Sequence, residues 1–97
     1  ILCYGIAFFK KRCLVYLKIK VIIRKEDKNL YIHVLDNGNG IKNKDKDYIF
    51  DFGYTTRFKG TGLGLYHTKE IVKELNGEIY YNDENKNETE FVIKVGQ

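Results

Sequence analysis

The middle of the chain, Asp36–Leu65, reads DNGNGIKNKDKDYIFDFGYTTRFKGTGLGL and contains two glycine loops. The first loop, Asp36–Ile41, follows a run in which apolar residues alternate, as in a strand with one buried face. The second loop, Gly60–Gly64, opens a run of apolar residues at helical spacing. A loop after a strand and a loop before a helix, both rich in glycine, predict a ligand site built largely from backbone atoms.

The first loop places a carboxylate at a strand end, beside Gly38 and Gly40. Glycine lets the backbone approach a flat ligand closely. A fixed carboxylate such as that of Asp36 is a good acceptor for an exocyclic amine, for example the adenine amino group. Because Asp-Asn-Gly is also common in tight turns, this loop alone leaves both interpretations open.

The second loop, Gly60-Thr61-Gly62-Leu63-Gly64, would present bare backbone N–H groups at a helix N-terminus, which is a favourable place for phosphate. It lacks the Gly-Lys-Ser/Thr of a P-loop, and no strand leads directly into it as in a dinucleotide fingerprint. A glycine-rich hinge is the alternative. Taken together, the two loops and the long irregular segment 42–61 predict a nucleotide pocket with a mobile lid.

The flanking sequence predicts the fold. Alternating apolar residues around Val21 and Ile32 indicate two antiparallel strands joined by a turn at residues 26–29. Leu65–Leu75 is expected to form a helix that stops at Asn76-Gly77, followed by strands at 78–82 and 90–95. We therefore expect an α/β (α+β) two-layer sandwich: a mixed, mostly antiparallel sheet with helices on one face.

Three segments resemble, in order and spacing, the G1, F and G2 boxes of histidine kinase catalytic domains: Asp36–Ile41, Ile49–Thr56 and Gly60–Leu65. The full Gly-Thr-Gly-Leu-Gly-Leu favours this family over the gyrase, mismatch-repair and chaperone ATPases of the same GHKL superfamily. The resemblance covers about residues 18–97 and implies a Bergerat-type ATP-binding fold. It further implies ATP binding and, in the full-length protein, transfer of the ATP γ-phosphoryl group to a histidine in two-component signal transduction.

The resemblance also assigns roles at matching positions. Asp36 would bind the adenine amino group, with Ile41 and Leu65 enclosing the base. The remaining expected nucleotide-binding residues are Gly38 and Gly40 in the first loop, Phe50, Thr55, Thr56, Arg57 and Lys59 in the lid, and Gly60, Thr61, Gly62, Leu63 and Gly64 beside the phosphates. Arg57 and Lys59 can equally be solvated lid charges. No catalytic residue is assigned, and His33 and His67 lie outside any phosphoacceptor motif.

Residues 1–17 depart from the family, because they contain no Asn, Asp, Glu or His. The family carries an Asn ligand for Mg²⁺ on a helix, the N box, before the first strand. Mg²⁺ prefers oxygen ligands; the ion is therefore expected from the family, but its Asn ligand is not found. We expect a degenerate or truncated N-box region at 1–17, with Ile6, Phe8, Phe9 and Leu14 packed under the sheet as a short helix, and the catalytic domain at 18–97. A non-catalytic relic of the same fold is the alternative function.

Composition limits the partners. The chain has a net charge of +4, and residues 1–28 carry eight Lys and Arg against Glu26 and Asp27. A nucleic-acid-binding module is therefore a third hypothesis, although a solvated strand explains such a run and we predict no nucleic-acid partner. We expect ATP or ADP as ligands, and in the full-length protein a dimerisation and phosphoacceptor domain and a response regulator. The fragment itself is expected to be monomeric.

Location follows from the N-terminal residues. Cys3 and Cys13 make neither a disulfide framework nor a zinc site and suit reduced cytosolic thiols. The apolar stretch Ile1–Phe9 is too short to span a bilayer, which needs about 20 residues. The chain contains no Met, so we interpret it as an N-terminally truncated piece of a cytoplasmic domain, attached to a membrane, if at all, through regions outside it.

Overall fold

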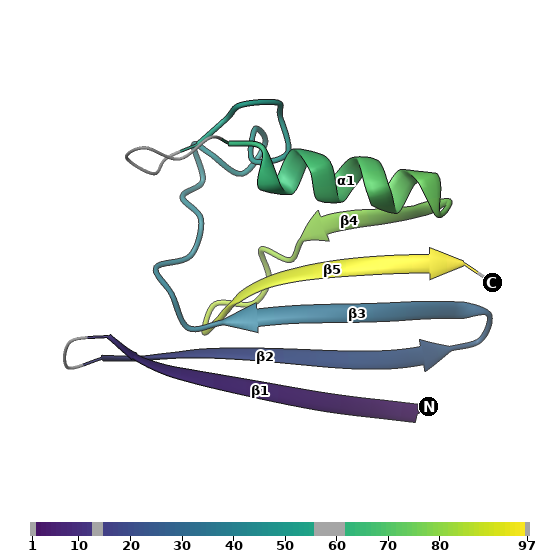
Figure 1. Ribbon diagram of the computed structural model, residues 1–97, viewed down its shortest axis with the longest axis horizontal. Coiled ribbons are helices and arrows are strands. Elements are labelled where there is room, and N and C mark those ends of the chain that lie inside the picture. Colours follow the sequence, from purple (N-terminus) through teal and green to yellow (C-terminus); the bar gives the residue numbers. More distant parts are fainter. Residues whose placement is uncertain (1, 13–14, 56–61, 97) are drawn as a thin grey trace.

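The computed structural model describes residues 2–12, 15–55 and 62–96, with side-chain surroundings from residue 18 onward. The elements are β1 (Leu2–Arg12), β2 (Val15–Glu26), β3 (Asn29–Asp36), α1 (Gly64–Glu74), β4 (Gly77–Tyr81) and β5 (Thr89–Gly96). The strands form a five-stranded sheet in the order β1-β2-β3-β5-β4, with α1 beside β4 (Figure 1). All four described strand pairings are antiparallel.

The strand register confirms the predicted alternation. Ile23 of β2 lies opposite Ile32 of β3, Ile32 lies opposite Ile93 of β5, and Ile93 lies opposite Ile79 of β4. Directly opposite residues in antiparallel strands share a face. An apolar row therefore crosses four strands, and each strand presents polar residues on its other face.

Helix α1 packs against β4 and ends as predicted. Val72 on the helix and Ile79 on the strand are both buried. Asn76 follows the helix in the left-handed conformation, with φ 58°, which Asn tolerates better than most residues. A Cβ added at Gly77 would lie 2.5 Å from the backbone oxygen of Lys94 and 3.2 Å from Val72 Cγ1, so the close approach of helix and sheet requires glycine here.

One detail of the expected fold is wrong. Residues 6–12, predicted as part of a short helix under the sheet, belong to the edge strand β1, where Phe8 lies opposite Ile19 and Ile6 opposite Val21; Leu14 lies outside the described residues. A short apolar run fits a helix or a strand equally well, and here the long edge of β2 supplies the hydrogen-bonding partner. The expected fold class is confirmed: the described residues form an antiparallel sheet with a helix beside it, as in an α/β two-layer sandwich.

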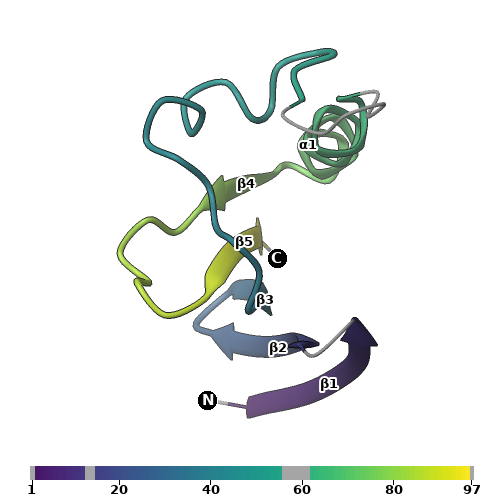
Figure 2. The same cartoon turned by 90° about the vertical axis from the view of Figure 1, so that its left-hand side faces the viewer.

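The segment between β3 and α1 contains no helix or strand in its described part, residues 37–55 and 62–63, as expected. It is a series of turns; the N–H groups of Asp45, Tyr48 and Asp51 each bond a carbonyl three residues earlier, at 2.9 Å. Figures 1 and 2 show it rising from the end of β3 to the start of α1. No helix in the described ranges is long and apolar enough to cross a membrane.

Candidate functional site

Asp36 is held rigidly at the end of β3. Its Oδ1 accepts the backbone N–H of Gly38 at 2.8 Å. A Cβ on Gly38 would lie 2.9 Å from the same oxygen, so the turn is tight enough to favour glycine. Because one carboxylate oxygen is anchored by the loop's own backbone, the direction of the second oxygen is fixed as well.

Thr89, the first residue of β5, lies directly opposite Asp36 in the sheet. Thr89 is 7% exposed, and its hydroxyl has no hydrogen-bond partner among the described residues. Leaving a buried polar group unsatisfied costs about 1–3 kcal/mol, and such groups in native proteins call for an explanation. Thr89 was not among the predicted site residues. Aligning the apolar residues of β3 and β5 would have placed it opposite Asp36.

Gly40 completes this part of the site. It adopts φ +75°, in the left-handed region that favours glycine. A Cβ added there would lie 3.6 Å from Thr89 Oγ1, an ordinary contact distance. The first loop therefore brings together a fixed carboxylate, an unsatisfied hydroxyl and a stretch of bare backbone.

A hollow of about 230 Å³ lies between the first loop and the turn that joins β4 to β5. Pockets that enclose a drug-sized ligand are usually about 300–1,000 Å³, so this hollow suits part of a nucleotide. Its lining is mostly polar: Gly38, Asn39, Gly40, Ile41, Asn43, Tyr81, Asp83, Asn85, Lys86, Asn87, Glu88 and Thr89. Within the described residues, the second glycine loop does not contribute to its walls.

An ion pair links the segment after the first loop to the β4–β5 turn, next to this hollow. Lys46 Nζ lies 3.0 Å from Asp83 Oδ2 in the β4–β5 turn. The hydrogen bond raises the pKa of Lys46 and lowers the pKa of Asp83. Both side chains reach solvent, so the pair is expected to orient the turn more than to stabilise the fold.

The second loop packs against the predicted lid through backbone atoms. Gly53 donates its N–H to the carbonyl of Gly62 at 3.1 Å, and both glycines have positive φ. A Cβ added at Gly62 would lie 2.3 Å from the carbonyl carbon of Gly53 and 2.6 Å from the oxygen of Tyr54. Gly53 was not among the predicted site residues, because a backbone contact between loops leaves no sequence pattern of its own.

A buried carboxylate holds together the described part of the segment that contains the predicted lid. Asp45, which is 6% exposed, accepts a hydrogen bond from the Tyr54 hydroxyl. This bond, together with burial, raises the pKa of Tyr54. The pair spans nine residues of chain and holds the turns of the segment together.

The other predicted lid and phosphate residues are placed less uniformly. Phe50 packs edge-on against Phe91 of the sheet, with 6.1 Å between ring centroids, and Lys69 Nζ lies 5.5 Å from the Phe50 ring. Leu63 and Leu65 are half-buried, Gly64 begins α1, and Thr55 is exposed. Thr56, Arg57, Lys59, Gly60 and Thr61 lie outside the described residues.

No metal centre can be assigned within the part of the chain that the structure describes. Among the described residues, no group of three or more His, Cys, Asp or Glu side chains could hold a metal ion. The residues around Asp36 and Thr89 instead offer hydrogen-bond donors and acceptors suited to a planar polar ligand.

Comparison with known proteins defines the class. The sequence profile described as "Histidine kinase-, DNA gyrase B-, and HSP90-like ATPase" matches residues 11–97, and the chain belongs to this family. Within the family, it is a catalytic ATP-binding domain of the sensor histidine kinase type, as its relatives indicate.

Two curated relatives and one solved structure illustrate this. The chain is 42% identical over 84 residues to the sensor protein CiaH of Streptococcus pneumoniae, and the alignment covers 80% of the chain and 19% of CiaH. It is 40% identical over 76 residues to sporulation kinase D of Bacillus subtilis, covering 78% and 15%. The nucleotide-free catalytic domain of the histidine kinase ThkA superposes with a TM-score of 0.71 at 27% identity, covering 82% of this chain and 53% of that one. The chain thus spans no more than a fifth of these curated relatives.

Proposed function

We propose that this domain binds ATP and ADP, with the adenine at the first glycine loop and the phosphates at the second. In the full-length protein it would present the γ-phosphoryl group for transfer to a histidine of a dimerisation domain, from which a response regulator receives it. This signalling would take place in the cytoplasm. The observation that carries the proposal is the anchored Asp36 carboxylate beside the unsatisfied, buried hydroxyl of Thr89.

The adenine half fits the residues present. The second oxygen of Asp36 would accept a hydrogen bond from the exocyclic amino group. The Thr89 hydroxyl can both donate and accept, so it can pair with a ring nitrogen directly or through water. Gly38 and Gly40 leave the backbone bare, which allows the flat base to approach. Binding would therefore satisfy the polar atom that the free domain leaves unpaired.

The phosphates would bind at the N-terminus of α1. The first N–H groups of a helix lack intrahelical partners and favour anions. The first turn of α1 contains no acidic residue to repel them. Arg57 and Lys59 would add positive charge from the lid. Phosphoryl transfer needs mainly positioning and charge stabilisation, and Mg²⁺, expected with ATP in this family, would supply part of the latter.

The test is a calorimetric titration of the purified chain with ADP and ATP, with and without Mg²⁺. We expect binding of both nucleotides, weakened about tenfold or more by Asp36→Asn, because hydrogen bonds to charged groups contribute roughly 1.5–3 kcal/mol. Asp47→Asn removes the same charge from an exposed position in the segment after the first loop, and it should leave the affinity unchanged.

The outcomes separate the alternatives. Binding that Mg²⁺ strengthens would show a complete site with a metal ligand outside the described residues. Binding indifferent to Mg²⁺ would support the adenine half and count against phosphoryl transfer by this domain. A folded chain that binds no nucleotide at millimolar concentration would overturn the proposal and leave the relic interpretation.

A further inference from the structure

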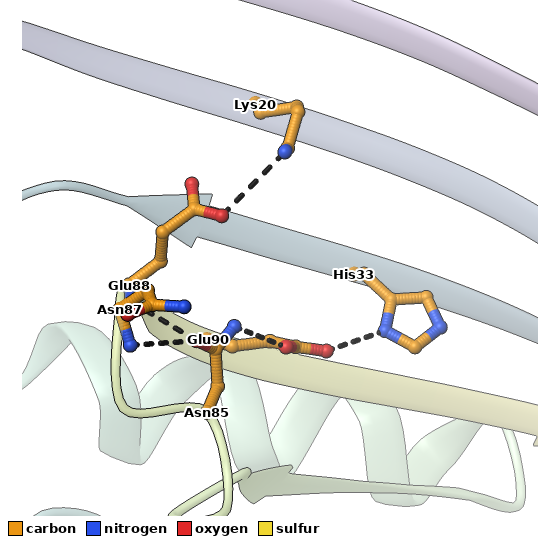
Figure 3. Close-up of polar contacts among 6 residues, drawn as sticks. All are labelled: Lys20, His33, Asn85, Asn87, Glu88 and Glu90. Atoms are coloured by element: carbon orange, nitrogen blue, oxygen red, sulfur yellow. Dashed lines mark hydrogen bonds and ion pairs between the residues drawn. The ribbon is translucent and has the colours of Figure 1, made fainter.

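A buried carboxylate on the other face of β5 is held from two sides. Glu90 Oε2 lies 2.8 Å from His33 Nδ1 on β3, and Glu90 Oε1 accepts the side-chain N–H of Asn85 at 2.9 Å (Figure 3). The Glu90 and His33 side chains are only 10% and 18% exposed. Burial raises the pKa of Glu90, but the hydrogen bonds from Asn85 and His33 outweigh it, so the pKa lies below its ordinary value.

Asn85 connects this carboxylate to the β4–β5 turn. Its Oδ1 accepts the backbone N–H groups of Asn87 and Glu88, at 3.1 and 3.0 Å. The oxygen of the Asn85 amide therefore stabilises the turn, and its nitrogen binds the turn to Glu90 of the sheet. A second, weaker tie runs from Glu88 Oε1 to Lys20 Nζ on β2, at 3.5 Å.

The turn held in this way is one wall of the hollow beside the first glycine loop. Successive residues of a strand point to opposite faces. Thr89 therefore faces the hollow while Glu90, the next residue, points toward His33 on the other side. If the Glu90 side chain were less firmly held, the backbone of β5 could shift at this point. Because only one peptide unit separates the two residues, such a shift would also displace the Thr89 hydroxyl.

We propose that His33, Glu90 and Asn85 are positioning residues of the nucleotide site, which hold the β4–β5 turn and Thr89 against the first loop. This inference rests on the proposed function, because its readout is nucleotide affinity. His33 and Glu90 lie outside the lining of the hollow and act through Asn85 and Thr89. A buried polar network of this kind specifies one arrangement when all its members are satisfied, and loses it when one is removed.

The sharpest test is Asn85→Asp. The new carboxylate still accepts the N–H groups of Asn87 and Glu88, but it replaces the donor to Glu90 with a like charge. Two adjacent carboxylates cannot both ionise easily, so the pair takes up a shared proton at mildly acidic pH and the link re-forms. We expect ADP to bind about tenfold more weakly than to the wild type at about pH 8, and nearly equally at about pH 5.

Affinities are compared as the ratio of variant to wild type at each pH, which cancels the titration of ADP itself. His33 on β3 contacts Glu90, and Lys20 and Glu88 form an ion pair beside it. The matched control is Asn87→Asp, which adds the same charge to the same turn at an exposed side chain. Its ratio should not change with pH over this range.

A second pair of variants addresses His33. His33→Ala leaves Glu90 without its partner on β3 and should weaken ADP binding about fivefold, whereas His33→Gln retains an N–H donor and should recover most of it. Thermal unfolding of each variant shows whether the chain is folded under the binding conditions. A wild type that binds no ADP would overturn both this inference and the proposed function. A wild type that binds ADP, with a pH-independent Asn85→Asp ratio and no recovery by His33→Gln, would overturn the positioning role alone.

Discussion

The two glycine loops use the same residue type in similar backbone conformations, but their surroundings differ. Gly40 has φ +75° and Gly62 has φ +69°. A Cβ on Gly40 would meet a side-chain hydroxyl at 3.6 Å, whereas a Cβ on Gly62 would lie within 2.3–2.6 Å of the backbone of Gly53 and Tyr54. The first loop therefore keeps space on its ligand side, and the second uses the missing side chain to pack two segments of backbone together.

Gly62→Ala is the strongest test of this difference. The added methyl group overlaps backbone atoms that cannot turn aside, and left-handed backbone costs a further 1–3 kcal/mol or so. We expect the second loop to lose its contact with Gly53, thermal unfolding to occur at lower temperature, and ADP binding to fall by about 30-fold or more. A variant with wild-type stability and affinity would contradict the packing argument.

The control for stability is Gly64→Ala. Among the described residues, apart from its chain neighbours and the backbone of α1, no atom lies within 4 Å of a Cβ at this position, which begins α1. Replacing glycine by alanine in a compatible conformation stabilises a protein by about 0.4–1 kcal/mol, because the unfolded chain loses freedom. Opposite shifts of the unfolding temperature in the two variants would locate the steric requirement at Gly62.

Thr89→Val tests the ligand side of the first loop. Valine has nearly the shape of threonine and removes a hydroxyl without a partner in the described structure, so the free energy of unfolding should stay the same or rise. ADP affinity, measured by calorimetry, should fall about five- to tenfold, since the base loses a hydrogen bond. A loss of stability with intact binding would make Thr89 part of the fold rather than of the site.

Gly40→Ala should have a smaller effect than Gly62→Ala. The surroundings leave room for a methyl group, so the cost is that of left-handed backbone, about 1–2 kcal/mol. Denaturant unfolding should show this loss, and the affinity for ADP should change less than it does for Gly62→Ala. Equal losses at the two positions would mean that the first loop is packed as tightly as the second.

The contrast between the loops also shows which features could be predicted from the sequence and which could not. Strands β2 and β3 and helix α1 follow from local periodicity, and Asp36 was identified from its place at a strand end before two glycines. Thr89 was missed because its role depends on the pairing of β3 with β5, which are far apart in the chain. The contact of Gly53 with Gly62 was missed for the same reason, since long-range backbone contacts carry no local pattern.

The N-terminal strand β1 shows a second reason why sequence alone can be insufficient. Its residues are apolar enough for a short helix or a strand, and local sequence does not separate the two. The choice depends on the unpaired edge of β2, which β1 covers along Leu2–Arg12. The division into residues 1–17 and 18–97 stays a prediction, and its boundary falls within β2, which begins at Val15.

The smallest expected effect concerns Glu90, which supports the β4–β5 turn next to the first loop. This effect depends on pH. The folded pKa of Glu90 lies below its ordinary value, so its ionised form contributes stability that is present above the unfolded pKa, about 4.3, and is lost as pH falls through the folded pKa. Glu90→Gln removes this contribution. The variant should be less stable than the wild type at neutral pH, and the difference should narrow as the pH is lowered below about 4.3. Urea unfolding at a series of pH values measures this, with Glu84→Gln, an exposed change in the same turn, as the control. A difference that does not depend on pH would mean that Glu90 supports the turn by its shape and hydrogen bonds, and that its charge contributes nothing to holding the first loop.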